Sequence, residues 1–206
     1  MMVPVSTSQC YPAKTARRLV PRKFVDHMHP DAIIAIAASA DSKALTQEIF
    51  GDEIGWLPWK KPGFELGLWL GKFCAENPDA KGVVLESHGL FTWGKTAKEC
   101  YDTTLRIINK AAAWLEDTRK RPAFGGAKVK LLSETERRAA ALRLMPDIRG
   151  RISKDVHKVG HFTDAPEVLE FVNSQQLATL APLGTSCPDH FLRTKIRPLI
   201  IPHDAE

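Results

Sequence analysis

The sequence predicts an α/β protein with a central sheet flanked by helices. Short apolar runs of strand length alternate with longer segments whose apolar residues recur every three or four positions. The clearest strands are expected at 82–87 and 90–93, joined by a tight His-Gly turn. The clearest helix follows and runs to about Arg119, with Thr96 and Glu99 spaced as a capping box at its start.

The elements before this stretch follow the same alternation. We expect a short strand at 24–29, a helix at 31–39, a second helix at 42–50, a strand at 54–59 and a helix at 63–76. Proline and glycine residues lie at several of these boundaries. Proline fits the start of a helix, and glycine fits its end.

A second segment begins after Pro122 and a Gly-Gly pair, which predict a linker. We expect a helix opening at Ser133 and weakening near Pro146, a strand at 159–162, a helix from about 164 to 180 and a last strand at 196–201. The predicted organisation is a leader at 1–21, unrelated to the rest or disordered, a first domain at 22–121 and a helix-rich α+β segment at 127–206.

Composition excludes several classes of protein. Hydrophobic residues make up 44% of the 206, which is enough for a packed core and excludes disorder as the main state. No apolar run has the length of a membrane span, and the N-terminus lacks the apolar segment of a secretory signal. The four cysteines lie far apart without a C-x-x-C pair, so we expect a cytoplasmic protein without disulfides and no membrane partner.

The positive net charge of +5 is unevenly distributed. Residues 24–118 carry nine basic and fourteen acidic side chains, whereas residues 119–154 carry eleven basic and three acidic ones. A nucleic-acid-binding domain usually carries its basic stripe on the folded element that reads the groove. The basic excess here is better explained by a solvated helix face, and nucleic acid is not an expected partner.

Three histidines are the main candidates for chemistry. Side chains two apart on a strand share a face, so His27 and His29 can reach one divalent ion, although two polar residues on a solvated strand would give the same pattern. His88 lies in the turn between two apolar runs, where the alternative is a turn histidine facing solvent. Three neutral imidazoles with an open fourth position would form a Lewis-acid site that can polarise a carbonyl.

These residues carry a resemblance to a known family. His-Met-His-Pro-Asp-Ala at 27–32 and Ser-His-Gly-Leu-Phe-Thr-Trp-Gly at 87–94, followed by a long helix, resemble the class II aldolase/adducin family. Pro-Trp-Lys-Lys-Pro-Gly at 58–63 and Gly-Thr-Ser-Cys-Pro-Asp-His-Phe-Leu-Arg-Thr-Lys at 184–195 resemble the bifunctional proteins that join a rhamnulose-1-phosphate aldolase to a short-chain dehydrogenase. The resemblance covers roughly residues 22–202.

The resemblance implies a fold, a metal site and a reaction. It implies a class II aldolase/adducin-like sheet flanked by helices, with His27, His29 and His88 as ligands of Zn²⁺ or another divalent metal. The implied reaction is the carbon–carbon lyase step of rhamnose catabolism, which splits the sugar phosphate rhamnulose 1-phosphate into dihydroxyacetone phosphate and lactaldehyde. It also implies a homo-oligomer.

The sequence departs from the family pattern at both ends. The family's general base is a Glu about twenty residues before the His-x-His motif, but no Glu precedes position 48, and Asp26 would point to the opposite face of its strand. The upstream phosphate-binding segments are absent, and no glycine-rich dinucleotide loop follows, so NAD is not expected. Glu86, two residues before His88, is the remaining catalytic candidate, with hydrogen bonding to a neighbouring loop as its alternative role.

We therefore expect a truncated, incomplete aldolase domain that is weakly active or inactive on its own. Two alternatives stay open. One is a non-catalytic family remnant or interaction domain, and the other is a sugar-phosphate epimerase, because enediolate chemistry can serve either outcome.

Overall fold

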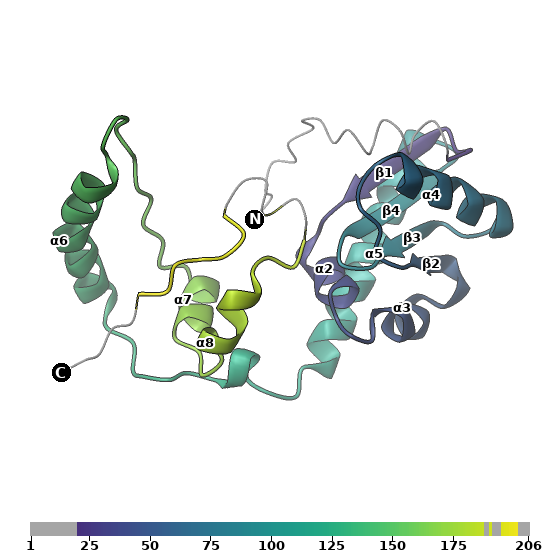
Figure 1. The fold of residues 1–206 in the computed structure, drawn as a ribbon. Coiled ribbons are helices and arrows are strands. Elements are labelled where there is room, and N and C mark those ends of the chain that lie inside the picture. Colours follow the sequence, from purple (N-terminus) through teal and green to yellow (C-terminus); the bar gives the residue numbers. More distant parts are fainter. Residues whose placement is uncertain (1–19, 188–189, 191–194, 202–206) are drawn as a thin grey trace. The chain divides into compact units, whose positions relative to one another are not determined.

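A computed structural model describes residues 20–187, 190 and 195–201. Residues 1–19, which make up most of the expected leader, lie outside the described residues. The chain divides into two compact units, one formed by residues 1–119 with 185–196 and the other by residues 120–184 with 197–206 (Figure 1). The first unit carries the sheet and all three candidate histidines.

A four-stranded mixed sheet with helices on both faces forms the first unit, as the sequence predicted (Figure 1). The strand order is β1-β4-β3-β2, with β1 antiparallel to β4, β4 antiparallel to β3, and β3 parallel to β2. The elements in chain order are β1 (Phe24–Met28), α2 (Asp31–Ala37), α3 (Ser42–Phe50), the 3₁₀ turn η1 (Gly51–Glu53), β2 (Ile54–Leu57), α4 (Phe64–Glu76), β3 (Gly82–Leu85), β4 (Gly89–Gly94) and α5 (Ala97–Thr118).

Alternation along the strands divides the core between the two faces of the sheet. On one face, α4 packs against side chains of β1, β3 and β4, and the cluster includes Leu66, Leu70, Val25, Val83, Leu85, Phe91 and Trp93. On the other face, α2, α3 and α5 cover the alternate strand positions, and the cluster includes Ile33, Ile36, Ile49, Ile54, Val84, Leu90, Ile107 and Ala111. The sheet is thus the middle layer of three.

Local capping fixes where the long helix starts. The Thr96 hydroxyl accepts a hydrogen bond from the Glu99 backbone N–H, which confirms the predicted cap. The Glu99 carboxylate reaches back to the backbone N–H of Lys95, one residue earlier than an ideal capping box requires. At the end of α3, Gly51 takes a φ of 60°, a left-handed conformation that favours glycine.

A buried chain of hydroxyl groups ties α5 to two strands. Thr92 Oγ1 on β4 lies 2.6 Å from Thr104 Oγ1 on α5, and the Thr104 hydroxyl lies 3.0 Å from the Asp26 carboxylate on β1. Thr104 has one proton to donate, so Thr92 donates to Thr104 when Thr104 donates to Asp26. Asp26 thus faces α5, on the side of β1 opposite His27, as predicted.

The second unit is built from helices and turns. Its elements are η2 (Ala123–Gly125), α6 (Glu134–Ile152), α7 (Pro166–Val172), α8 (Leu177–Leu180) and η3 (Ala181–Leu183). The predicted Ser133–Glu136 capping box opens α6 and is fully formed. The helix continues through Pro146, which forgoes one N–H donor in a helix that has no buried residue.

Three predictions for the second segment were wrong. Residues 159–162 and 196–201 are irregular rather than strands, and the described residues around them provide no strand with which they could pair. The helix expected from 164 to 180 is broken after α7, because the Asn173 side chain bonds to both backbone groups of Val129, across 44 residues. Within the described residues, no helix is long and apolar enough to cross a membrane.

We predict that Thr104→Val destabilises the first unit by about 1–3 kcal/mol. The change keeps the shape of the side chain but leaves the Thr92 hydroxyl and the Asp26 carboxylate without their shared partner. The measurement is urea unfolding followed by tryptophan fluorescence, since all five tryptophans lie in the first unit. Thr118→Val, at an exposed hydroxyl on the same helix, is the control and should change stability by less than about 0.5 kcal/mol. Equal effects of the two changes would contradict the prediction.

Candidate metal centre

His27 and His29 are placed by strand β1 at the edge of the sheet. In the β1–β4 register His27 stands opposite Phe91, and the two rings stack with centroids 4.0 Å apart and an interplanar angle of 9°. His29 follows β1 directly, two residues beyond His27, so the alternation of side chains brings it to the same side. Both histidines therefore lie on the face of the sheet covered by α4.

His88 is placed by the tight turn between β3 and β4. The turn begins after Leu85, and Ser87 adopts a φ of 50°, an uncommon value for a residue other than glycine. Two backbone hydrogen bonds hold this conformation, from Ser87 N–H to the Ala37 carbonyl and from His88 N–H to the Leu85 carbonyl. His88 is only 3% exposed, so the alternative of a turn histidine facing solvent is wrong.

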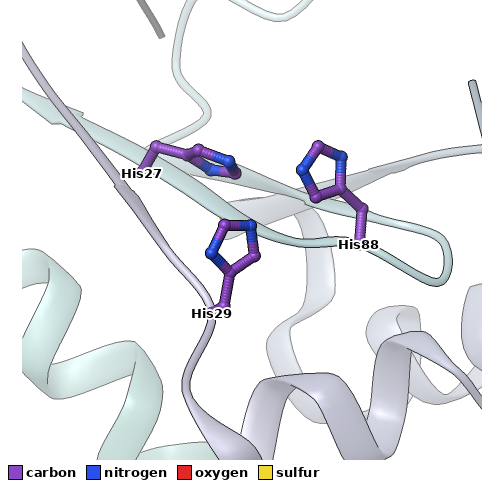
Figure 2. A group of neighbouring side chains, drawn as sticks. All are labelled: His27, His29 and His88. Carbon is purple, nitrogen blue, oxygen red and sulfur yellow. The ribbon is translucent and has the colours of Figure 1, made fainter. Parts of the chain in front are cut away.

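The three imidazoles converge on one point, as Figure 2 shows. Ring centroids lie 4.5 Å apart for His27 and His29, 5.0 Å for His27 and His88, and 5.2 Å for His29 and His88. One nitrogen from each ring lies within 4.8 Å of the others. In a tetrahedral zinc site with bonds of about 2.0–2.1 Å, ligand nitrogens lie roughly 3.4 Å apart, so the three imidazoles would move slightly closer together to hold one ion.

The environment of His27 tests whether this group fits a metal ion. Its Nδ1 lies 3.0 Å from the carbonyl oxygen of Leu90, a pure acceptor, so Nδ1 carries the proton and Nε2 has a lone pair. That Nε2 is buried and has no hydrogen-bond partner among the described residues. An unsatisfied buried acceptor is costly, and a cation bound at this point would satisfy it.

Burial keeps His27 neutral. The pKa of His27 is lowered well below its usual value, first because burial disfavours the charged form and then because His29 and His88 would repel a second positive charge. The backbone carbonyl of Leu90 opposes the shift but does not outweigh it. Neutral imidazole is the form that coordinates a metal.

Gly89 leaves the space that His29 occupies. A Cβ atom at this position would lie 2.6 Å from the Met28 carbonyl oxygen and 2.7 Å from Cδ2 of the His29 ring. The glycine that follows His88 is thus needed for the close approach of β1 to the turn. The sequence had suggested only a tight turn at this position, because contact between distant backbones leaves no local pattern.

The Glu86 side chain is hydrogen-bonded to a neighbouring loop. Strand β3 ends at Leu85, so Glu86 belongs to the turn that carries His88 rather than to the strand. Its carboxylate accepts a hydrogen bond of 2.7 Å from the backbone N–H of Trp59, in the loop after β2. Within the described part of the chain, the ligand cluster consists of the three histidines and does not include Glu86.

Comparison with known proteins identifies the family. The model of the family described as "Class II Aldolase and Adducin N-terminal domain" matches residues 16–115, and the one described as "Aldolase class II, second domain" matches residues 139–206. The chain belongs to the class II aldolase family. The candidate metal centre lies entirely within the first of these two matches.

Individual relatives differ in length and description. The chain is 39% identical over 188 residues to the "Uncharacterized oxidoreductase YuxG" of Bacillus subtilis. The aligned region covers 91% of this chain and 27% of the relative. The chain thus spans about a quarter of the length of that relative, and the description as an oxidoreductase is that of the whole longer protein.

Two solved structures of the family are similar to parts of the chain. The N-terminal class II aldolase domain of a conserved Thermoplasma acidophilum protein is 32% identical, with a TM-score of 0.46 over 50% of this chain and 46% of that one. The L-fuculose-1-phosphate aldolase of Thermus thermophilus is 18% identical, with a TM-score of 0.41 over 57% of this chain and 68% of that one.

We predict that Gly89→Ala destabilises the first unit by about 1–3 kcal/mol, because the new methyl group overlaps the Met28 carbonyl and the His29 ring. Urea unfolding followed by tryptophan fluorescence measures the loss. Gly150→Ala in α6 is the matched control, since nothing lies within 4 Å of the added atom. It should leave the tryptophan transition unchanged. An unchanged transition in Gly89→Ala would show that the close approach at the turn is not required.

We also predict that the metal-free protein loses stability as the pH falls below about 6.5. The pKa of His27 is depressed in the folded state, so between that pKa and about 6.5 the unfolded chain binds more protons than the folded one. Below about pH 6.5, this one group lowers the free energy of unfolding by up to about 1.4 kcal/mol for each pH unit, until the pH reaches the pKa of the folded state. The stability that it contributes is therefore complete above about pH 6.5 and is lost as the pH falls.

The measurement is the urea midpoint at pH 7.5 and at pH 5.5 in the presence of a chelator. His27→Gln removes the titrating group and should reduce the difference between the two midpoints. His157→Gln, at an exposed histidine of the second unit, should not. A pH dependence that is the same in His27→Gln and in the wild type would contradict the assignment.

Proposed function

We propose that His27, His29 and His88 hold one divalent metal ion, zinc in the first instance. The observation that carries the proposal is the convergence of three imidazole nitrogens within 4.8 Å, one of them a buried Nε2 without a hydrogen-bond partner among the described residues. Nitrogen donors favour zinc and related transition metals over magnesium or calcium, which prefer oxygen ligands.

We further propose that the chain is the metal-binding part of an aldolase-type lyase that acts on a sugar phosphate, with rhamnulose 1-phosphate as the specific candidate. A divalent ion at this centre supplies Lewis acidity toward a carbonyl or hydroxyl oxygen of the substrate. Family membership supports the reaction class, and the motifs at 58–63 and 184–195 support the choice of sugar.

The residues of this chain have distinct parts in the proposal. His27 keeps its proton on Nδ1, where the Leu90 carbonyl holds it, and so presents Nε2 in a fixed orientation. The stacked ring of Phe91 covers one side of the imidazole and excludes water there. The Glu86 carboxylate accepts a hydrogen bond from the Trp59 N–H and thus orders the loop after β2, rather than acting as a base.

One observation favours a second candidate function. The described cluster contains three imidazoles but no carboxylate that could move a proton at the reacting carbon. General acid–base groups typically contribute about 10²–10⁴ in rate. A domain that holds a metal without efficient lyase activity is therefore the alternative.

The first prediction from the proposal concerns metal content. Wild-type protein loaded with zinc and dialysed should retain about one zinc per chain by elemental analysis, because three ligands from a rigid sheet and turn bind it together. His88→Ala should lower zinc affinity by more than about 100-fold, the upper end of the loss caused by changing an outer-shell partner. His161→Ala, at an exposed histidine of the second unit, is the control and should bind zinc as the wild type does. Zinc-free wild-type protein would overturn the proposal.

An activity assay separates the functional alternatives. Zinc-loaded protein is incubated with rhamnulose 1-phosphate, and the products are identified by chromatography. Dihydroxyacetone phosphate and lactaldehyde, lost in His27→Ala, would support the lyase. An epimeric sugar phosphate would indicate an epimerase instead. Stoichiometric zinc without turnover would favour the domain that holds a metal without lyase activity.

A further inference from the structure

The backbone of the turn that carries His88 is held by hydrogen bonds from separate elements. The Glu86 N–H donates to the Leu57 carbonyl at the end of β2, at 2.9 Å, and the Ser87 N–H donates to the Ala37 carbonyl at the end of α2, at 2.8 Å. In both contacts the turn supplies the N–H donor. Neither contact involves the backbone carbonyl of His88.

That carbonyl is met by a residue 99 positions further along the chain. The thiol of Cys187 donates to the His88 carbonyl oxygen with Sγ and O 3.3 Å apart. Cys187 is only 2% exposed, and its own carbonyl accepts a hydrogen bond from the His190 backbone N–H. Residues 185–196 belong to the first unit, so the chain returns to the unit of the metal centre after the helices of the second unit.

The peptide group between His88 and Gly89 connects this contact to two of the histidines. Its carbonyl belongs to the residue that bears one imidazole, and its nitrogen belongs to Gly89, where an added Cβ atom would lie 2.7 Å from the ring of His29. A rotation of this peptide plane would therefore shift His88 directly and change the space available to His29. A hydrogen bond on the carbonyl restrains that rotation.

We propose that Cys187 is a positioning residue of the metal centre, acting through the His88 carbonyl, so that the C-terminal segment completes a site whose ligands all lie before residue 89. The inference rests on the proposed function, because it requires that the three histidines bind a metal ion. Outer-shell partners of metal ligands typically contribute about 10–100-fold to metal affinity. A purely structural role for a small buried thiol is the competing explanation.

Cys74 offers a matched control for that explanation. It is also 2% exposed, but it lies on α4 in the apolar cluster that includes Leu70. Zinc affinity is measured by competition with a chromophoric chelator for the wild type, Cys187→Ala, Cys187→Ser and Cys74→Ala. Cys187→Ala should bind zinc about tenfold more weakly. Cys187→Ser should stay near the wild type, because its hydroxyl can donate to the same carbonyl, and Cys74→Ala should stay within about twofold.

A spectroscopic readout separates positioning from a general loss of stability. In the cobalt-loaded protein, the visible absorption bands should shift in Cys187→Ala but not in Cys74→Ala, since only the first change reorients a ligand. Identical zinc affinities and cobalt spectra in Cys187→Ala and the wild type would overturn the inference. Wild-type protein that binds neither ion would instead overturn the proposed function, and the inference with it.

The wild-type protein provides a test that does not depend on the folding of any variant. If Cys187 stabilises the metal-bound geometry, bound metal must in turn stabilise the contact of Cys187, because coupling between sites is reciprocal. Saturating zinc should therefore slow alkylation of Cys187, followed by peptide mass spectrometry, several-fold more than alkylation of Cys74. Equal effects of zinc on the two thiols would contradict the inference.

Discussion

The pairing of β1 with β4 is the constraint on which the candidate centre depends. This register sets His27 opposite Phe91 and brings its Nδ1 to the carbonyl of Leu90. A slip of one residue would turn every side chain of β1 to the other face. Asp26 would then enter the apolar α4 side, and His27 would face α5. The β1–β4 register is therefore required for His27 to reach the candidate centre.

The centre combines apolar surroundings with nitrogen donors. His27 is stacked on a phenyl ring and faces two further imidazoles, which favours its neutral form. The nearest acid along the chain from His88, Glu86, is occupied by the loop after β2. A centre of imidazole nitrogens without a carboxylate favours a transition metal over a hard cation. It also explains why the described residues support metal binding more directly than proton transfer.

The sequence predicted the first unit well because its signals were local. Apolar periodicity, the Thr96 cap and the Gly51 boundary placed its strands and helices within about two residues of the observed ends. The second unit was harder, since a nonlocal contact of Asn173 with Val129 ended α7 early and no partner strand was present for 159–162 among the residues that the structure describes. The three histidines were predicted from their motif and from the family resemblance. The Leu90 carbonyl, the space at Gly89 and the thiol of Cys187 were not, because contacts across tens of residues leave no pattern in the chain.

The strand order has a consequence for how the protein folds. Among the described strands, β1 leaves the ribosome first, but its ladder partner β4 lies more than sixty residues later, and such nonlocal pairing is slow to form. Until β4 is in place, the strand displays two histidines two residues apart on an unburied segment. A metal ion that binds this pair early would meet its third imidazole only when the sheet closes. Metal binding and the closing of the sheet are thus expected to be coupled steps of folding. The ion would join β1 to the turn that precedes β4.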